Sequence, residues 1–174
     1  MATRIFDVDG NDITPPPKPV EELEYLCEIG GEFDETSVTL SIYSENLDRE
    51  EITQLLGVQP TKAWNPGERH PFGNRRSGKT RTVDWGKWYL TIDRNRNPVE
   101  PKIRKLLQQC TPSLETWHKL ASKYKIWLTV AAHLDNWNRE LDLAPDVLRL
   151  LSERCLMLKV DVYFDGDKKD LDVD

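Results

Sequence analysis

The segment Gly73–Thr80 reads GNRRSGKT and matches the P-loop pattern, in which backbone amides, a lysine and a hydroxyl hold nucleotide phosphates and magnesium. This chemistry needs a buried strand before the first glycine and a helix after the last residue. Residues 65–72 are rich in proline and glycine and predict no strand, and Arg81–Ile92 alternates like a strand rather than a helix. We therefore expect the match to be coincidental.

Two carboxylates near the N-terminus, Asp7 and Asp9, have the spacing that haloacid-dehalogenase-type phosphatases use to attack a phosphate and hold magnesium. Such a site needs a parallel strand buried in a large sheet. Here the proline-rich run Pro15–Pro19 follows closely, and Asn11 stands where the phosphatase motif has threonine. A hairpin over Arg4–Ile13 with an Asp-Gly tip is the simpler interpretation.

The remaining reactive side chains form no catalytic or metal-binding pattern. No serine, cysteine or carboxylate accompanies a histidine in the way that a nucleophile and its base require. The cysteines are odd in number and too widely spaced for a disulfide framework or a zinc site. These residues are His70, His118, His133, Cys27, Cys110 and Cys155. We expect no catalytic residue, no metal, no cofactor, and a reducing cytoplasm as the location.

A stretch of arginines and aromatic residues, which we call the basic loop (residues 62–81), is the strongest candidate for a binding site. Guanidinium groups pair with carboxylates or phosphates, and aromatic rings add contact area at low entropic cost. The residues expected to bind a partner are Trp64, Arg69, Phe72, Arg75, Arg76, Lys79, Arg81 and Trp85. The alternative is a solvated loop whose Trp64 and Trp85 cover the edge of a sheet.

The periodicity of apolar residues along the chain predicts the strands and helices that position these residues. Alternation of apolar and polar residues predicts four strands, Thr36–Tyr43, Val83–Ile92, Ile126–Leu134 and Leu158–Phe164. Helical spacing predicts four helices: one capped by Asp48 and ended by Gly57, one beginning near Pro101, one capped by Thr111, and Pro145–Cys155. Strands with a single apolar face need helices on one side only. The expected fold class is α+β, a two-layer sandwich with a mixed or antiparallel sheet of at least four strands.

The same spacing predicts which side chains point into the core. They are Val38, Leu40, Ile42, Trp88, Leu90, Ile92, Ile126, Leu128, Val130, Ala132, Leu158, Val160, Val162 and Phe164 on strands, and Ile52, Leu55, Leu56, Ile103, Leu106, Leu107, Cys110, Leu114, Trp117, Ala121, Tyr124, Leu148, Leu151 and Cys155 on helices.

The opposite face of the sheet carries aromatic residues, namely Tyr43, Tyr89, Trp127, His133 and Tyr163. Aromatic rings on an open sheet can stack nucleic-acid bases. The net charge of −6 disfavours a phosphate binder. We therefore expect this face to be covered by residues 1–34 or by a second copy of the chain.

Charge is distributed unevenly along the 174 residues. Residues 1–37 hold ten acids and two bases, whereas residues 59–105 hold twelve bases and four acids. The length suits one domain, and no apolar run approaches the about 20 residues that span a bilayer. We expect an acidic, proline-containing N-terminal extension over residues 1–34, one α+β domain over 35–165 and an acidic tail over 166–174.

Three pieces of the chain also resemble one protein family. They are LSIYSENLDREEITQLLGVQPTKAWNPGE at Leu40–Glu68, Trp88 near the start of the following strand, and LKVDVYF at Leu158–Phe164. Through them, the chain from about Val38 to Phe164 resembles a bacterial family known as domain of unknown function 4279. The resemblance implies a small bacterial intracellular protein and brings no established activity or catalytic residue. Some relatives of this kind are suspected of being immunity proteins that neutralise a toxin.

Together these observations predict a non-enzymatic bacterial module that binds a protein partner, with toxin neutralisation as the most specific form. One alternative is nucleotide or nucleic-acid binding through the basic loop, although the acidic composition disfavours nucleic acid. A second alternative is a magnesium-dependent phosphatase that uses Asp7 and Asp9. We expect no membrane association, and a homodimer stays open.

Overall fold

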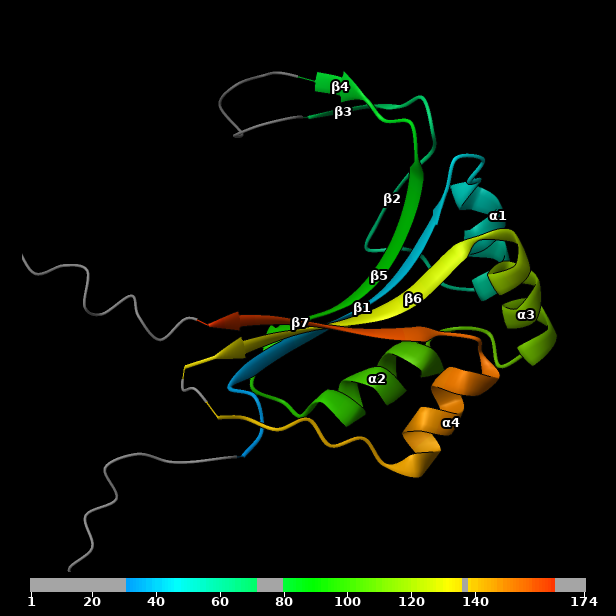
Figure 1. Cartoon of the computed structure of the whole chain (residues 1–174). Helices are drawn as coiled ribbons and strands as arrows, with labels where there is room; N and C mark the ends of the chain where they lie inside the picture. Colours follow the sequence, from blue (N-terminus) through cyan, green and yellow to red (C-terminus); the bar gives the residue numbers. More distant parts are fainter. Residues whose placement is uncertain (1–30, 72–79, 136–137, 165–174) are drawn as a thin grey trace, which may run out of the picture.

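The computed structural model describes residues 31–71, 80–135 and 138–164 (Figure 1). Within these ranges it contains four helices and seven strands. Their bounds are β1 Glu35–Ser44, α1 Arg49–Leu56, β2 Lys62–Trp64, β3 Arg69–Pro71, β4 Thr80–Thr82, β5 Gly86–Asn95, α2 Val99–Gln108, α3 Leu114–Lys123, β6 Lys125–Leu134, α4 Pro145–Glu153 and β7 Met157–Phe164. The expectations for the hairpin at Arg4–Ile13, for Asp7, Asp9 and Cys27, and for the acidic tail concern residues outside these ranges.

A five-stranded sheet in the order β2-β5-β1-β6-β7 forms the centre of the fold. β1 pairs antiparallel with both β5 and β6, β2 pairs antiparallel with β5, and β7 runs parallel to β6. Two parallel strands need a long connection between them, and α4 lies in the connection from β6 to β7. The sheet is therefore mixed, which agrees with the prediction.

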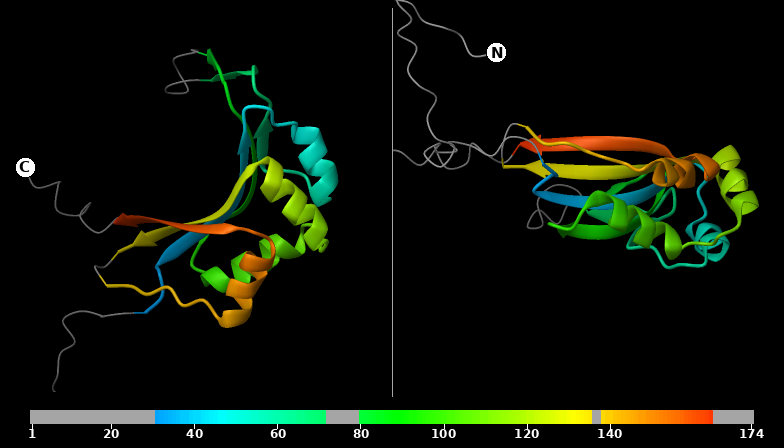
Figure 2. Two further views of the ribbon diagram at one scale, coloured as in Figure 1. Left: turned by 45° about the vertical axis from the view of Figure 1, so that its right-hand side comes forward. Right: turned by 90° about the horizontal axis from the view of Figure 1, so that it is seen from below.

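The four helices of the described residues lie on one side of this sheet (Figure 1; Figure 2). The sheet is curved, with the helices on its convex side and no helix on its concave side. The two layers confirm the α+β class expected from strands with a single apolar face. β3 and β4 form a separate two-stranded sheet that projects at one end of the molecule.

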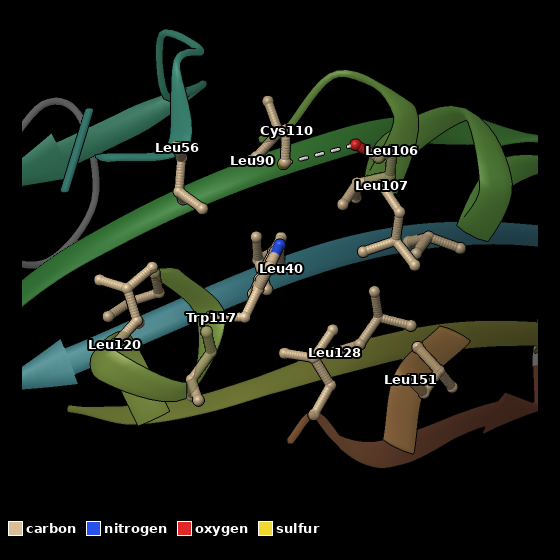
Figure 3. Packing of buried hydrophobic residues seen from close by; sticks show 14 of the residues in the cluster. Leu40, Leu56, Leu90, Leu106, Leu107, Cys110, Trp117, Leu120, Leu128 and Leu151 are labelled. Atoms are coloured by element: carbon tan, nitrogen blue, oxygen red, sulfur yellow. Dashed lines mark hydrogen bonds between the residues drawn. The ribbon is translucent and has the colours of Figure 1, made fainter. Parts of the chain in front are cut away.

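The hydrophobic core fills the space between the sheet and the helices. Figure 3 shows Leu40, Leu90 and Leu128 of the three central strands among the side chains of this cluster. Trp88 and Trp117 are fully buried, and each donates a hydrogen bond from its Nε1, to Thr53 Oγ1 at 3.1 Å and to the carbonyl oxygen of Thr111 at 2.9 Å respectively. The indole N–H groups of Trp88 and Trp117 are therefore satisfied, whereas the buried Nε1 of Trp64 has no hydrogen-bond partner within the described residues.

Helix starts follow local capping chemistry, with one correction. Asp48 accepts hydrogen bonds from the backbone amides at the start of α1, and Gly57 ends that helix with φ of 72°, as predicted. The predicted cap of α3 is wrong: Ser113, not Thr111, accepts from the Thr116 amide. Thr111 lies two residues before this cap: its Oγ1 accepts from the Ser113 amide at 3.3 Å, and its own amide donates to the carbonyl oxygen of Leu56 at 2.8 Å.

Several predicted core positions on helices are wrong. Leu148 of α4 is 49% exposed, and Val147 is buried in its place together with Leu151. Cys155 is exposed because α4 ends at Glu153 and Cys155 lies in the following turn, with a positive φ of 54°. By contrast, Cys110 is buried as predicted, and burial raises the pKa of its thiol to about 12.

Exposed apolar side chains also occur at the first turn of α3 and along β7. Leu114 is 37% exposed, and Leu120 is buried on the same helix. Val160, Val162 and Phe164 were expected to point into the core but are 39%, 57% and 52% exposed. Leu158 alone of the predicted β7 positions packs against the core. β7 lies at the edge of the sheet, where the apolar side of a strand can extend beyond the helices that cover its neighbours.

The basic loop contains more regular structure than the sequence predicts. β2 joins the edge of the main sheet beside β5, and β3 pairs antiparallel with β4. The expectation of no strand before Gly73 is therefore wrong for Arg69–Pro71, although this strand belongs to an exposed hairpin and not to a buried sheet. Strands β4 and β5 occupy the place where a P-loop requires a helix, as expected. Residues 73–79 lie outside the described ranges.

One charged side chain, Lys102 of α2, is buried in the core with 3% of its surface exposed. Its Nζ donates to the carbonyl oxygen of Thr36 at 2.6 Å, to Thr36 Oγ1 at 2.7 Å and to the carbonyl oxygen of Asn95 at 2.8 Å. These acceptors lie where the pairing of β1 and β5 shifts register between Thr36 and Val38. Burial lowers the pKa of Lys102, and the charge of Glu35 partly opposes this effect.

Residues before β1 already pack against the domain. Phe33 contacts the core, and Asp34 holds the side chain of Arg139 through two hydrogen bonds of 3.2 and 3.1 Å. The Arg139 guanidinium keeps the pKa of the Asp34 carboxyl below its usual value. This pair fastens the segment before α4 to the start of the sheet.

Candidate binding face

The concave side of the sheet carries a dense group of aromatic and lysine side chains. Because Leu40 and Ile42 of β1 are fully buried on the helix side, Ser41 and Tyr43 point to the other side. The register of the ladders places the outward residues of the neighbouring strands beside them. We use the name concave face for Ser41, Tyr43, Lys62, Trp64, Lys87, Tyr89, Lys125, Trp127 and Lys159.

Tyr43 is the centre of the ring contacts on the concave face. Its ring stacks on Trp127, with centroids 4.6 Å apart and an interplanar angle of 14°. It meets the ring of Tyr89 edge-on at 5.5 Å, and the two tyrosine hydroxyls are hydrogen-bonded. Burial raises the pKa of the Tyr43 phenol above its usual value. Trp64 extends the row through an edge contact with Tyr89 at 5.7 Å.

A small residue makes room for these rings. Ser41 lies opposite Tyr89 on one side and Trp127 on the other, and only 3% of its surface is exposed. A serine at this position leaves space for large rings on both neighbouring strands to close over the centre of β1. The aromatic row is therefore part of the packed sheet and is pre-formed.

Lysine ammonium groups lie over several of these rings. Lys159 Nζ is 3.6 Å from the centroid of Trp127, and Lys87 Nζ is 4.9 Å from that of Tyr43. Lys125 Nζ lies 4.8 Å from the ring centroid of Trp85. Cation–π attraction holds the charged groups close to the sheet. A positive surface is thus built into a chain whose net charge is −6.

The hairpin of β3 and β4 adjoins one end of the concave face. Its His70 ring lies 4.3 Å from the ring of Trp64, so that Trp64 links the hairpin to the main sheet. Arg69 and Arg81 are on the paired strands of this hairpin. In Figure 1 the hairpin extends from the start of β5 toward the helix-free side of the sheet. Cationic groups of the hairpin therefore border the concave face.

Two hollows share Tyr43 and Trp85 in their walls. One has a volume of 460 Å³ and is also lined by Arg81 and Lys87. The other has a volume of 430 Å³ and is also lined by Lys125. Trp85 is 36% exposed, and each hollow also has a carboxylate in its wall, Asp84 in the first and Glu45 in the second. Both volumes fall within the range of about 300–1,000 Å³ that is usual for ligand pockets.

The structure brings together part of the predicted site. Trp64, Arg81 and Trp85 lie at the hairpin end of the concave face. Arg69 is on the same hairpin, but it alternates with His70, the residue that contacts Trp64, and so points to the other side. The other predicted residues, Phe72, Arg75, Arg76 and Lys79, lie outside the described ranges. The basic loop and the aromatic outer face were treated as two candidates in the sequence, yet the contact between Trp64 and Tyr89 joins them into one surface.

Three lysines of this surface were missed by sequence reasoning, namely Lys87, Lys125 and Lys159. A signal for two of them exists in the sequence, because Lys87 precedes Tyr89 by two residues and Lys125 precedes Trp127 by two residues. On a strand, residues two apart share a face. Only the strand order shows that both pairs lie beside Tyr43.

The histidines have structural contacts in the described part of the chain. His118 Nε2 lies 2.9 Å from the carbonyl oxygen of Glu153, and the His133 ring stacks on Tyr163 at 4.9 Å. Within residues 31–71, 80–135 and 138–164, no group of three or more His, Cys, Asp or Glu side chains is arranged to hold a metal ion. None of the helices there has the length and apolar character needed to cross a bilayer.

Comparison with known proteins identifies the family of this chain. No curated protein and no solved structure matches it. A family model covers most of the chain, from the residue before β1 to the residue after β7, which confirms the resemblance seen in the sequence. The model, described as a domain of unknown function (DUF4279), matches residues 34–165, and the chain therefore belongs to this family.

Proposed function

We propose that this protein is a non-enzymatic binding module that holds an acidic segment of a protein partner on its concave face. The observation that carries the proposal is the continuous layer of rings around Tyr43 with lysine ammonium groups over it. Rigid aromatic rings supply contact area at little entropic cost, and lysines attract carboxylates. Arg81 of the basic loop lines a hollow together with Tyr43 and Lys87 and so extends the same surface.

The ring geometry favours a protein over a nucleic acid. Trp127 is contacted by Tyr43 of β1 on one neighbouring strand and by Lys159 of β7 on the other. Base stacking requires an open ring face, as in single-strand binding folds. On this surface a base would have to displace one of the two contacts. A carboxylate-bearing segment can instead pair with the lysines while the rings keep their packing.

The most specific form of the proposal is neutralisation of a toxin inside a bacterial cell. An inhibitor of this kind needs a pre-formed surface whose charge complements that of its target. The support for this form is a face with exposed lysines on an otherwise acidic chain. It predicts one stable partner with an acidic contact surface.

Affinity capture from the native host, followed by mass spectrometry, tests the proposal. The wild-type chain is expected to recover one protein partner. The double variant Lys87→Glu/Lys125→Glu should bind that partner at least about tenfold more weakly, because two attractive contacts become repulsive. Binding is measured by calorimetry with the purified partner.

The matched control is Lys105→Glu/Lys119→Glu, which makes the same charge change on exposed positions of the helices. Its affinity should remain within about twofold of wild type, since screening limits the reach of distant surface charges to about 10 Å. Capture of no partner contradicts the binding function. Equal weakening by both double variants contradicts the assignment to the concave face.

Nucleotide or nucleic-acid binding remains the second candidate, because lysines and aromatic rings occur together on an open sheet. Calorimetry with ATP, GTP and short single-stranded oligonucleotides at low salt distinguishes it. We expect no heat of binding at millimolar nucleotide. A salt-dependent oligonucleotide signal that Lys87→Glu/Lys125→Glu removes would replace the protein partner with nucleic acid.

A further inference from the structure

Strand β7 ends the main sheet with an edge that no other strand of the described residues pairs. The strand order is β2-β5-β1-β6-β7, so β7 contacts β6 on one side only. It is eight residues long, and seven of those residues are exposed. Such an edge presents a row of backbone donors and acceptors that another strand can use.

Both faces of β7 carry exposed apolar side chains. On the helix side Val162 and Phe164 are 57% and 52% exposed, and on the other side Met157 and Tyr163 are 62% and 48% exposed. Soluble proteins usually shorten an open edge or protect it with charge or proline. β7 contains no proline, and its two charged residues have opposite signs. These features are typical of a strand that is covered in the assembled protein.

We propose that a second copy of this chain covers the edge, and that the two β7 strands pair antiparallel about a two-fold axis through Val160. In this register Lys159 of each copy lies opposite Asp161 of the other. Leu158 then faces Val162, and Met157 faces Tyr163. The pairing therefore matches opposite charges and also matches apolar residues on both faces of the sheet.

The charge pattern selects this register among its neighbours. If the register of the two β7 strands shifts by two residues in one direction, Lys159 of one copy lies opposite Lys159 of the other. If it shifts by two residues in the other direction, Asp161 lies opposite Asp161. Like charges directly opposite each other destabilise a strand pair. An unrelated partner strand would have no reason to match the order of residues in β7, whereas MLKVDVYF complements itself when reversed. A second copy is therefore the occupant that the residues favour.

The dimer joins the two concave faces. Paired residues of an antiparallel ladder point to the same side, so the helices of both copies lie on one side and the aromatic rows on the other. Lys159 stands at the junction, beside Trp127 of its own copy. Lys159 belongs to both surfaces, but the dimer is measured on the chain alone, so the inference does not rest on the proposed binding function.

Sedimentation velocity of the full chain over a range of concentrations tests the dimer by charge exchange. Wild type should be dimeric at micromolar concentration. Lys159→Asp and Asp161→Lys should each raise the dissociation constant about tenfold or more, because each creates like-charge pairs across the interface. The double variant Lys159→Asp/Asp161→Lys restores opposite pairs and should recover dimerisation. A monomeric wild type, or a dimer indifferent to both single changes, overturns the proposal.

Disulfide trapping tests the register without relying on stability. In a Cys27→Ser/Cys155→Ser background, Val160→Cys places two thiols opposite each other, with Cα atoms about 4.5–5.5 Å apart, which a disulfide can bridge. Val162→Cys is the matched control, because residue 162 of one copy lies opposite residue 158 of the other. The two cysteines at position 162 would therefore be about 13 Å apart along the strand. We expect an oxidised covalent dimer for Val160→Cys only. A dimer trapped at Val162 instead, or at neither position, refutes this register.

Discussion

At the scale of single residues, Lys102 is the clearest case of a side chain whose role depends on tertiary contacts. Its ammonium group fills three acceptor positions contributed by Thr36 and Asn95. In the sequence it is one lysine of a predicted helix, where lysines normally face water. The irregular pairing of β1 and β5 creates the acceptors, and α2 brings the donor.

Replacing this lysine should reveal the cost of the unpaired acceptors. Lys102→Met keeps the apolar stem and leaves buried backbone oxygens without a donor, so we expect a loss of about 2–4 kcal/mol in the free energy of unfolding. Urea unfolding followed by circular dichroism measures it. Lys105→Met, on an exposed position of the same helix, is the control and should change stability by less than about 0.5 kcal/mol. Equal stability of the two variants would show that Lys102 contributes nothing specific.

Asp34 supplies a pH-dependent contribution through its contact with Arg139. The pKa of its carboxyl is lower in the folded chain than in the unfolded chain, where it is about 3.9. The stabilisation is therefore complete above the unfolded pKa and is lost as pH falls through the folded pKa. Asp34→Asn should be less stable than wild type at pH 7, and the difference should shrink below about pH 4.

Urea unfolding at pH 7, 5, 4 and 3 measures this difference. Asp93→Asn, at an exposed position near the end of β5, is the matched control. The contact between Asp34 and Arg139 has no pH-dependent role if the stability difference between Asp34→Asn and wild type stays constant over this pH range.

At the scale of elements, the start of β5 depends on the close approach of two neighbouring segments. A Cβ atom at Gly86 would lie 2.6 Å from Leu47 Cβ and 2.8 Å from Pro66 Cδ. Leu47 belongs to the turn after β1, and Pro66 belongs to the basic loop. Because Gly86 shares a side of β5 with the buried Trp88, glycine at this position allows the turn after β1 and the basic loop to pack against the helix side of the sheet.

Gly86→Ala should force these segments apart. We expect a loss of about 1–3 kcal/mol in the free energy of unfolding, which is the usual cost of overpacking a tight site. Thermal and urea unfolding measure it, with Lys87→Ala as the control on the next, half-buried position of the strand. An unchanged unfolding midpoint for Gly86→Ala would mean that the two segments can move at no cost.

The strands, helices and caps were predicted most accurately where the residues that determine them are close together in the sequence. The strands β1 and β6 and the cap at Asp48 follow from residues that are adjacent in sequence. The cap of α3 is Ser113 and not the predicted Thr111, because the helix begins at Leu114 and Thr111 Oγ1 accepts from the amide of Ser113, before the helix. β2 and β3 were missed because each has three residues and depends on pairing with a strand further along the chain.

At the scale of the whole molecule, the concave face and the open edge of β7 belong to one surface. The rings around Tyr43 end at Trp127, and Lys159 connects them to the edge strand. A dimer through β7 would double the length of this surface, so that one partner could contact both copies. The two tests remain separate, because charge reversal at Lys87 and Lys125 changes the binding face without altering β7.

The sequence alone determined the fold class, the order of the main strands and helices, and most core positions. Alternation in β1 and β6 and helical spacing in α2 are local patterns, and burial of an apolar face follows from them. The tertiary structure decided that Val160, Val162 and Phe164 are exposed, that Lys102 is buried, and that two candidate surfaces meet at Trp64. These outcomes depend on strand order and on which helices cover which strand. That information lies in contacts between residues far apart in the chain.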